Sequence, residues 1–204
     1  MANKVFTGII EALGSIAESA VVGGDRRLCI RAPSGFFAQS NLGDSIAVNG
    51  VCLTAVEFRN EGFVADLSAE TLNATTANQW TVGRSVNLER ALTPAKQLGG
   101  HLVSGHVDGV GRLLKKYEEA RSWRMEFQVP RALARYVARK GSICIDGVSL
   151  TVNDVSAEAF GVNIVPHTMT HTTLGGLQEG DAVNLEVDQI ARYLERLLAA
   201  REET

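Results

Sequence analysis

The feature that most constrains this sequence is an internal repeat. The stretch NGVCLT at residues 49–54 has a near twin, DGVSLT at residues 146–151, 97 positions further along the chain. At this single offset the chain matches itself without a gap from Phe6 to about Arg90, with about twenty identities in about 85 aligned positions. One ungapped offset over such a length indicates two copies of a single structural unit. We therefore expect two similar domains.

Each copy carries the pattern of short β-strands. In SIAVNGVCLTAVEF and SICIDGVSLTVNDV, apolar residues lie on both sides of Asn-Gly and Asp-Gly, which is a strong hairpin signal. The stretches FVADLS and FGVNIV alternate between apolar and polar residues, and VNLE closes each copy. Several short strands in one small repeat favour an all-β fold of antiparallel barrels, because closure removes exposed edges. RALARYVARK and SAETLNATT predict short helices at the barrel ends.

The linker between the copies is ALTPAKQLGGHL at residues 91–102, where Pro94 and a Gly-Gly pair interrupt regular structure. We place the first barrel at residues 1–100 and the second at residues 101–187. Residues 188–204 have no counterpart in the first copy and predict an α-helix with one apolar stripe, formed by Ile190, Leu194, Leu197 and Leu198. Such a helix has to bury its stripe, which favours an oligomer.

Composition argues against several other classes of function. The net charge is −3, and three Tyr and two Trp offer little stacking surface, so a barrel that binds nucleic acid or oligosaccharide is not expected. The apolar stretch VFTGII is too short for a secretory signal or a membrane span, and a cytoplasmic location with no membrane association is expected. Three cysteines without paired spacing predict free thiols. His167 and His171 are predicted to lie where a strand end runs into a turn, and because they lack a third ligand we predict no metal site.

Motifs along nearly the whole chain resemble those of the riboflavin synthase family, alpha-chain type. They are FTGII, GDSIAVNGVCLT, GGHLVSGHVDG, GSICIDGVSLTV, VPHT with HTTLG beyond it, and VNLEVDQIARYLERLL. The resemblance implies two tandem six-stranded Greek-key barrels plus a C-terminal α-helix that joins three chains into a homotrimer. It implies a transferase that needs no cofactor.

The reaction implied is the dismutation of two molecules of 6,7-dimethyl-8-ribityllumazine. One molecule donates a four-carbon unit to the other, and the products are riboflavin and 5-amino-6-(D-ribitylamino)uracil. The active site is expected where the first barrel of one subunit faces the second barrel of a neighbour. Two identical molecules that act as donor and acceptor need two similar pockets that differ in their side chains. Holding both rings at reacting distance supplies much of the barrier reduction.

The resemblance gives three residues catalytic roles. Cys52 would deliver or stabilise the nucleophile, water or thiolate, that adds to the acceptor lumazine, although a cytosolic cysteine taken alone is more often a small buried residue. Ser45 would line the acceptor pocket near that centre. His106 would act as general acid or base on the acidic methyl group, since imidazole titrates near neutral pH. His101 is expected to make a structural or inter-barrel contact.

The other candidates are expected to border the two pteridine pockets, where main-chain groups read the ring edge and apolar side chains cover its faces. For the first pocket they are Gly8, Ile9, Ile10, Leu53, Thr54, Asp66, Leu67 and Ser68. For the second pocket they are Gly105, Val107, Lys140, Ser149, Leu150, Thr151, Asn163, Ile164, Val165, Pro166, His167 and Thr168.

One alternative is a non-catalytic lumazine- or flavin-binding protein of the same fold. Such a protein would be expected to lose the reactive side chains, and Ser45, Cys52 and His106 are all present. The enzyme is therefore the favoured interpretation. Association with a separate lumazine synthase is left open by the sequence.

Overall fold

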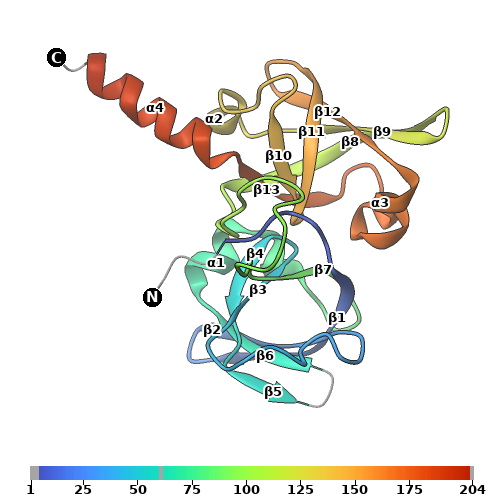
Figure 1. Cartoon of the computed structure of the whole chain (residues 1–204), viewed down its shortest axis with the longest axis vertical. Coiled ribbons are helices and arrows are strands. Elements are labelled where there is room, and N and C mark those ends of the chain that lie inside the picture. The colour runs from blue at the N-terminus through green and yellow to red at the C-terminus, as the bar shows by residue number, and fades with distance from the viewer. Residues whose placement is uncertain (1–4, 60–61, 203–204) are drawn as a thin grey trace.

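The structure is a computed structural model that describes residues 5–59 and 62–202. Two β-barrels follow one another along the long axis of the molecule, and a helix extends from the second (Figure 1). The first barrel is a seven-stranded sheet in the order β4-β3-β7-β1-β2-β6-β5. Its strands are β1 Ala12–Val22, β2 Asp25–Arg31, β3 Ser45–Val48, β4 Val51–Thr54, β5 Glu57–Arg59, β6 Gly62–Leu67 and β7 Ser85–Arg90. Because β4 and β5 end the order at opposite edges yet adjoin in the chain, the sheet curls back on itself.

The second barrel is closed, with the strand order β10-β11-β12-β9-β8-β13. Its strands are β8 Gly109–Glu119, β9 Ser122–Gln128, β10 Ser142–Ile145, β11 Val148–Val155, β12 Ala159–Ile164 and β13 Ala182–Val187. At the repeat offset β11 corresponds to β4 and β5 together, so the seven strands of the first barrel are the same architecture with one strand interrupted. The predicted tandem barrels are confirmed.

Short helices border the barrels. They are α1 Ala69–Ala74 with the 3₁₀ turn η1 Thr76–Gln79, α2 Arg131–Ala134, and α3 Pro166–His171 with η2 Thr173–Gly176. The prediction of a turn around His167 was wrong. Pro166 stands in the first turn of α3, where the missing N–H and the fixed φ of proline suit a helix start, and the rings of His167 and His171 stack at 4.0 Å. In the described part of the chain, no three His, Cys, Asp or Glu side chains are grouped as a metal site.

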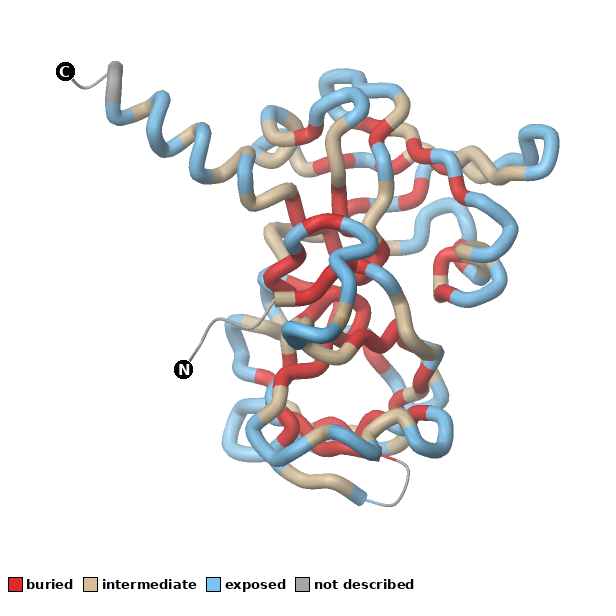
Figure 2. The backbone as a smooth tube through the Cα atoms, viewed as in Figure 1, coloured by how far each residue is buried: buried red, intermediate tan, exposed pale blue. Residues whose placement is uncertain are grey.

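The C-terminal helix is α4, Gln189–Glu202. As Figure 2 shows, it is mostly exposed, whereas buried backbone runs through both barrels and across their junction. Its apolar residues Ile190, Leu194, Leu197 and Leu198 are between 51% and 69% exposed in the single chain. No helix in the described residues is both long and apolar enough to cross a membrane.

The duplicated hairpin turns meet at the junction between the barrels. Asn49 and Asp146 have φ values of 43° and 45°, and the glycines that follow them are also at positive φ, as a two-residue hairpin turn of this kind requires. A Cβ on Gly50 would lie 2.7 Å from the amide nitrogen of Gly147, so the turns touch backbone to backbone. This contact explains why both turns carry glycine at the second position.

Two asparagines tie the turns together across the junction. Asn87 Nδ2 donates to the Asp146 carbonyl at 2.8 Å, and Asn184 Nδ2 donates to the Asn49 carbonyl at 2.9 Å. These matching contacts relate the two copies by a local twofold. A small apolar cluster of Phe6, Ala47, Val103 and Cys144 completes the junction. Cys29, Cys52 and Cys144 are thiols that form no disulfide, as predicted.

Candidate active site

Two short segments cross between the barrels, and we call them the first strap (residues 6–11) and the second strap (residues 103–108). They meet at an isolated bridge in which the Phe6 amide donates to the Val103 carbonyl at 2.7 Å and the Val103 amide returns the bond at 3.1 Å. Beyond the bridge each strap pairs with the other barrel. The Gly8 carbonyl accepts from the Ser149 amide at 2.8 Å, and the Gly105 carbonyl accepts from the Cys52 amide at 2.9 Å.

This exchange corrects the predicted division of the pockets. Gly8, Ile9 and Ile10 were assigned to the first pocket, but their strap lies on the second barrel, where Ile10 packs against the core. Gly105 and Val107 were assigned to the second pocket, but the strap that carries them and His106 lies on the first barrel, and Val107 packs against that core. The exchange is made by main-chain hydrogen bonds and buried apolar contacts, which leave no separate mark in the sequence.

A buried glutamate holds the start of each strap. Glu89 accepts from the Thr7 amide and hydroxyl at 2.8 and 2.7 Å through Oε1, and from the Gly8 amide at 2.9 Å through Oε2. Glu186 makes the same three bonds to Ser104 and Gly105, at 2.6, 2.7 and 2.9 Å. Burial raises the pKa of the Glu186 carboxyl, while the bonds from Ser104 oppose that rise. The signal that could have identified both residues is the repeated VNLE.

Ser45, Cys52 and Thr54 belong to one face of the β3–β4 hairpin. Ser45 pairs with Thr54 and Ala47 with Cys52, and directly paired residues share a face of an antiparallel sheet. The residues between them, Ile46 and Leu53, lie on the opposite face and fill the barrel core. Ser45 is 9% exposed and Cys52 is half-buried.

The second strap covers Cys52. A Cβ added to Gly105 would lie 2.6 Å from the Cys52 Cβ, and the positive φ of Gly105, 75°, independently favours glycine. The next residue, His106, is exposed. The structure therefore brings the three predicted catalytic residues to one hairpin of the first barrel and the strap that lies on it.

The predicted residues on β6 and α1 have defined partners. Asp66 accepts from Arg27 Nε and Nη2 at 2.7 and 2.8 Å, and this guanidinium holds the pKa of the exposed carboxyl below its usual range. Ser68 accepts from the Thr71 amide as the N-cap of α1. Leu67, like Leu53, is buried, so its side chain serves the barrel core. Sequence analysis missed Arg27, which reaches Asp66 through the pairing of β2 with β6.

The predicted residues of the second pocket lie on three consecutive elements. Ser149, Leu150 and Thr151 are on β11, and Asn163 and Ile164 are on β12. Val165 is the N-cap of α3, and Pro166, His167 and Thr168 form its first turn. Lys140 lies in the turn before β10 and donates its amide to the Val152 carbonyl of β11 at 2.8 Å.

His101 contacts both repeats. Its Nδ1 lies 2.7 Å from the Ser149 hydroxyl, and its amide donates to the Thr7 carbonyl of the first strap at 3.2 Å. Burial lowers the pKa of His101, which favours the neutral imidazole.

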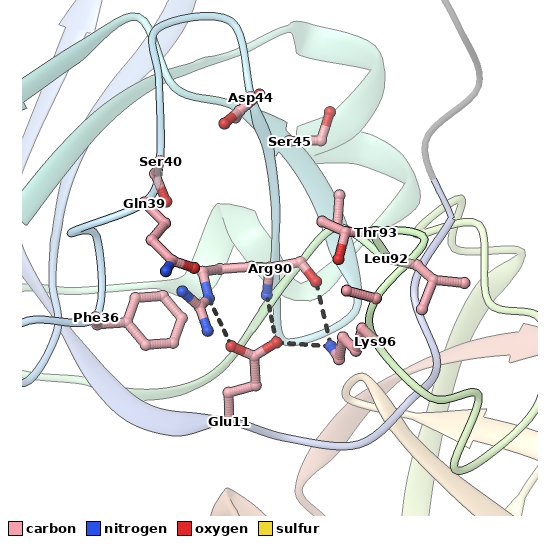
Figure 3. Close-up of a pocket in the computed structure, with 12 residues that line it drawn as sticks. Glu11, Phe36, Gln39, Ser40, Asp44, Ser45, Arg90, Leu92, Thr93 and Lys96 are labelled. Carbon is pink, nitrogen blue, oxygen red and sulfur yellow. Dashed lines mark hydrogen bonds and ion pairs between the residues drawn. The ribbon is translucent and has the colours of Figure 1, made fainter.

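A pocket of about 740 Å³ lies beside Ser45 on the first barrel. Figure 3 shows Glu11 between Arg90 and Lys96, with Phe36 and Gln39 on the same wall. Arg90 Nε and Lys96 Nζ lie 2.7 and 2.6 Å from the Glu11 carboxylate. Neither Cys52 nor His106 lines this pocket. His106 instead lines a pocket of about 380 Å³ with residues of α4.

Comparison with known proteins agrees with this duplicated architecture. The model of the lumazine binding domain matches the chain twice, at residues 7–91 and 104–188. The chain is similar to solved structures of LumP, one complexed with 6,7-dimethyl-8-(1'-D-ribityl) lumazine and one with riboflavin. The TM-scores are 0.81 and 0.82 at 26% and 27% identity, over 89% of this chain and 98% of each LumP chain.

Similarity to several curated proteins is higher. Riboflavin synthase of Photobacterium phosphoreum is 45% identical over 95% of this chain and 89% of its own length. The enzymes of Mycobacterium tuberculosis (strain ATCC 25618 / H37Rv) and Bacillus subtilis (strain 168) are 44% and 39% identical, over 95% of this chain and 98% and 90% of their own lengths. The chain belongs to the riboflavin synthase family and carries the lumazine binding domain twice.

Proposed function

We propose that the protein is a riboflavin synthase that converts two molecules of 6,7-dimethyl-8-ribityllumazine into riboflavin and 5-amino-6-(D-ribitylamino)uracil. Each barrel binds one lumazine. One molecule transfers a four-carbon unit to the other, and no separate group donor is needed. The function rests on membership of the family over nearly the whole chain.

The observation that carries the mechanism is the exchange of straps. Because Gly105 of the second strap lies on Cys52 of the first barrel, we assign Cys52 and the next strap residue, His106, to one pocket. The matching pocket on the second barrel has Ser149 and Ile9 at the corresponding positions. The two pockets are therefore alike in backbone and unlike in reactive groups, as a reaction between identical molecules with different tasks requires.

In this assignment the first pocket holds the acceptor. Cys52 delivers or stabilises the nucleophile that adds to the acceptor ring, and Ser45, on the same face of the hairpin, hydrogen-bonds near that centre. His106 moves the proton of the ring methyl group as general acid or base. The second pocket holds the donor through Ser149, Thr151, Asn163 and the start of α3. Its main role is to position the donor lumazine and not to transfer protons.

In this assignment the two pockets of one chain do not face each other. In Figure 1, α1 and α3, which border the first and second pockets, lie on opposite sides of the molecule. A reaction between their ligands therefore requires the first barrel of one subunit to face the second barrel of another. We propose a homotrimer joined through the exposed apolar residues of α4, and a cytoplasmic location.

A non-catalytic lumazine carrier is the second candidate, because the LumP structures hold lumazine and riboflavin on a similar fold. Ser45, Cys52 and His106 together favour the enzyme. The test is to incubate purified, chelator-treated protein with 6,7-dimethyl-8-ribityllumazine alone and to follow both compounds by absorbance. Riboflavin formed from two lumazines for each product molecule supports the enzyme, whereas tight binding without product supports the carrier.

A further inference from the structure

Arg192 of α4 reaches back to the strap that carries His106. Its Nη2 donates to the Asp108 carboxylate at 2.6 Å and to the His106 carbonyl at 3.2 Å. The Arg192 side chain is 35% exposed and that of Asp108 is 15% exposed, so this contact is partly shielded from water. One guanidinium thus bridges two acceptors that lie two residues apart on the second strap.

The matching strap is held differently. In the first repeat, Glu11 stands at the position of Asp108 and is bound by Arg90 of β7 and by Lys96 of the linker. In the second repeat, Val187 stands at the position of Arg90 and offers only its amide, which donates to Asp108 at 2.8 Å. The cation for the second strap therefore comes from α4, outside the barrel.

We propose that Arg192 is a positioning residue for His106, an inference that rests on the proposed function of His106. Both bonds come from Nη2, whose two N–H groups diverge in the rigid plane of the guanidinium, so this one nitrogen fixes the backbone from His106 to Asp108. A lysine ammonium is a point charge on a flexible stem and holds two acceptors less rigidly. A fixed backbone sets where the exposed imidazole can point, and small errors of position cost rate. The same contact links the predicted oligomerisation helix to the first pocket, since α4 cannot move away without releasing the strap.

The test compares three variants of the full-length protein. Arg192→Met removes the charge and the donors but keeps an unbranched side chain suited to a helix. Arg192→Lys keeps the positive charge but lacks the planar guanidinium. Arg121→Met is the control for loss of an exposed arginine, because Arg121 lies in the turn between β8 and β9, outside α4 and both straps. We expect Arg192→Met to lower kcat by about tenfold or more with KM changed by less than about twofold, Arg192→Lys to recover part of kcat, and Arg121→Met to match the unaltered protein.

A second readout is independent of catalysis. The chain has four histidines, so the ring signals of ¹³C-histidine-labelled protein can be resolved individually by NMR. Arg192→Met should shift or broaden the His106 signal and leave those of His101, His167 and His171 in place. An unchanged His106 signal together with an unchanged kcat would overturn the positioning role. If the unaltered protein makes no riboflavin, the proposed function fails, and the His106 signal still decides whether Arg192 orders the strap.

Discussion

At the scale of single residues, Asp146 and Asn49 show how one charge changes the junction between the barrels. Both hold the same turn, and their side-chain oxygens accept from the amides of Asn184 and Asn87 at 2.8 and 2.7 Å. Asp146 is only 2% exposed, and burial raises the pKa of its carboxyl from 3.8 to about 7. The first copy avoids the free-energy cost of burying a charge, because asparagine is neutral.

The raised pKa of Asp146 makes the stability of the fold depend on pH. The folded state holds this proton more tightly than the unfolded state, so the contribution to stability is complete below pH 3.8 and is lost as the pH rises to about 7. Asp146→Asn should therefore raise the free energy of unfolding by about 1–4 kcal/mol at pH 8 and by little at pH 4. Denaturant unfolding of both proteins at the two pH values measures the difference. An equal gain at both would mean that Asp146 does not titrate in this range.

Cys52 should matter for turnover and not for folding. Cys52→Ser keeps a small, half-buried side chain while removing the thiol, so we expect kcat to fall by at least about tenfold with an unchanged thermal midpoint. Cys29→Ala, a buried thiol on β2, serves as the control for loss of a cysteine as such. Full activity of Cys52→Ser would remove this thiol from the mechanism.

The sequence predicted catalytic roles for Ser45, Cys52 and His106, because repeat and family motifs mark each position, but it did not place His106 beside the first barrel. Arg27, Glu89, Glu186 and Arg192 were missed as partners of the site. They act through contacts between residues 39 to 86 positions apart, which depend on strand register and on the path of α4.

At the scale of elements, the straps decide which residues share a pocket. Both hairpins, the short helices after β6 and β9, and the terminal helix follow from local patterns, and the sequence predicted them. The exchange of straps could not be predicted in that way, since both barrels offer equivalent edges. The predicted boundary after residue 100 remains a prediction.

The glycines of the straps provide a direct test of the exchange. Gly105→Ala would set a Cβ 2.6 Å from the Cys52 Cβ at a φ of 75°, so we expect a loss of about 1–3 kcal/mol in the free energy of unfolding and a large loss of activity. Gly176→Ala is the matched control, because a Cβ there meets no atom within 4 Å. Normal stability and activity of Gly105→Ala would show that the second strap does not rest on Cys52.

At the scale of the whole molecule, the proposed reaction takes place between two copies of the chain. In this proposal one pocket holds Cys52 of the first barrel and His106 of the second strap, and the other pocket lacks these groups. In Figure 1, α1 and α3, which adjoin the residues assigned to the two pockets, lie on opposite sides of a single chain, so the proposed site needs two chains. Assembly through α4 would complete it and would also set the strap through Arg192.

Subunit exchange between two blocked variants tests this claim most directly. Thr54 and Thr151 are matching exposed residues, so Thr54→Trp should fill the first pocket and Thr151→Trp the second without disturbing either core. Each variant alone should make little riboflavin. After the two are mixed in equal amounts and allowed to exchange subunits, about a quarter of the facing pocket pairs would be intact, and activity should return to about that fraction. No recovery in trimers shown to contain both variants would contradict a site shared between subunits.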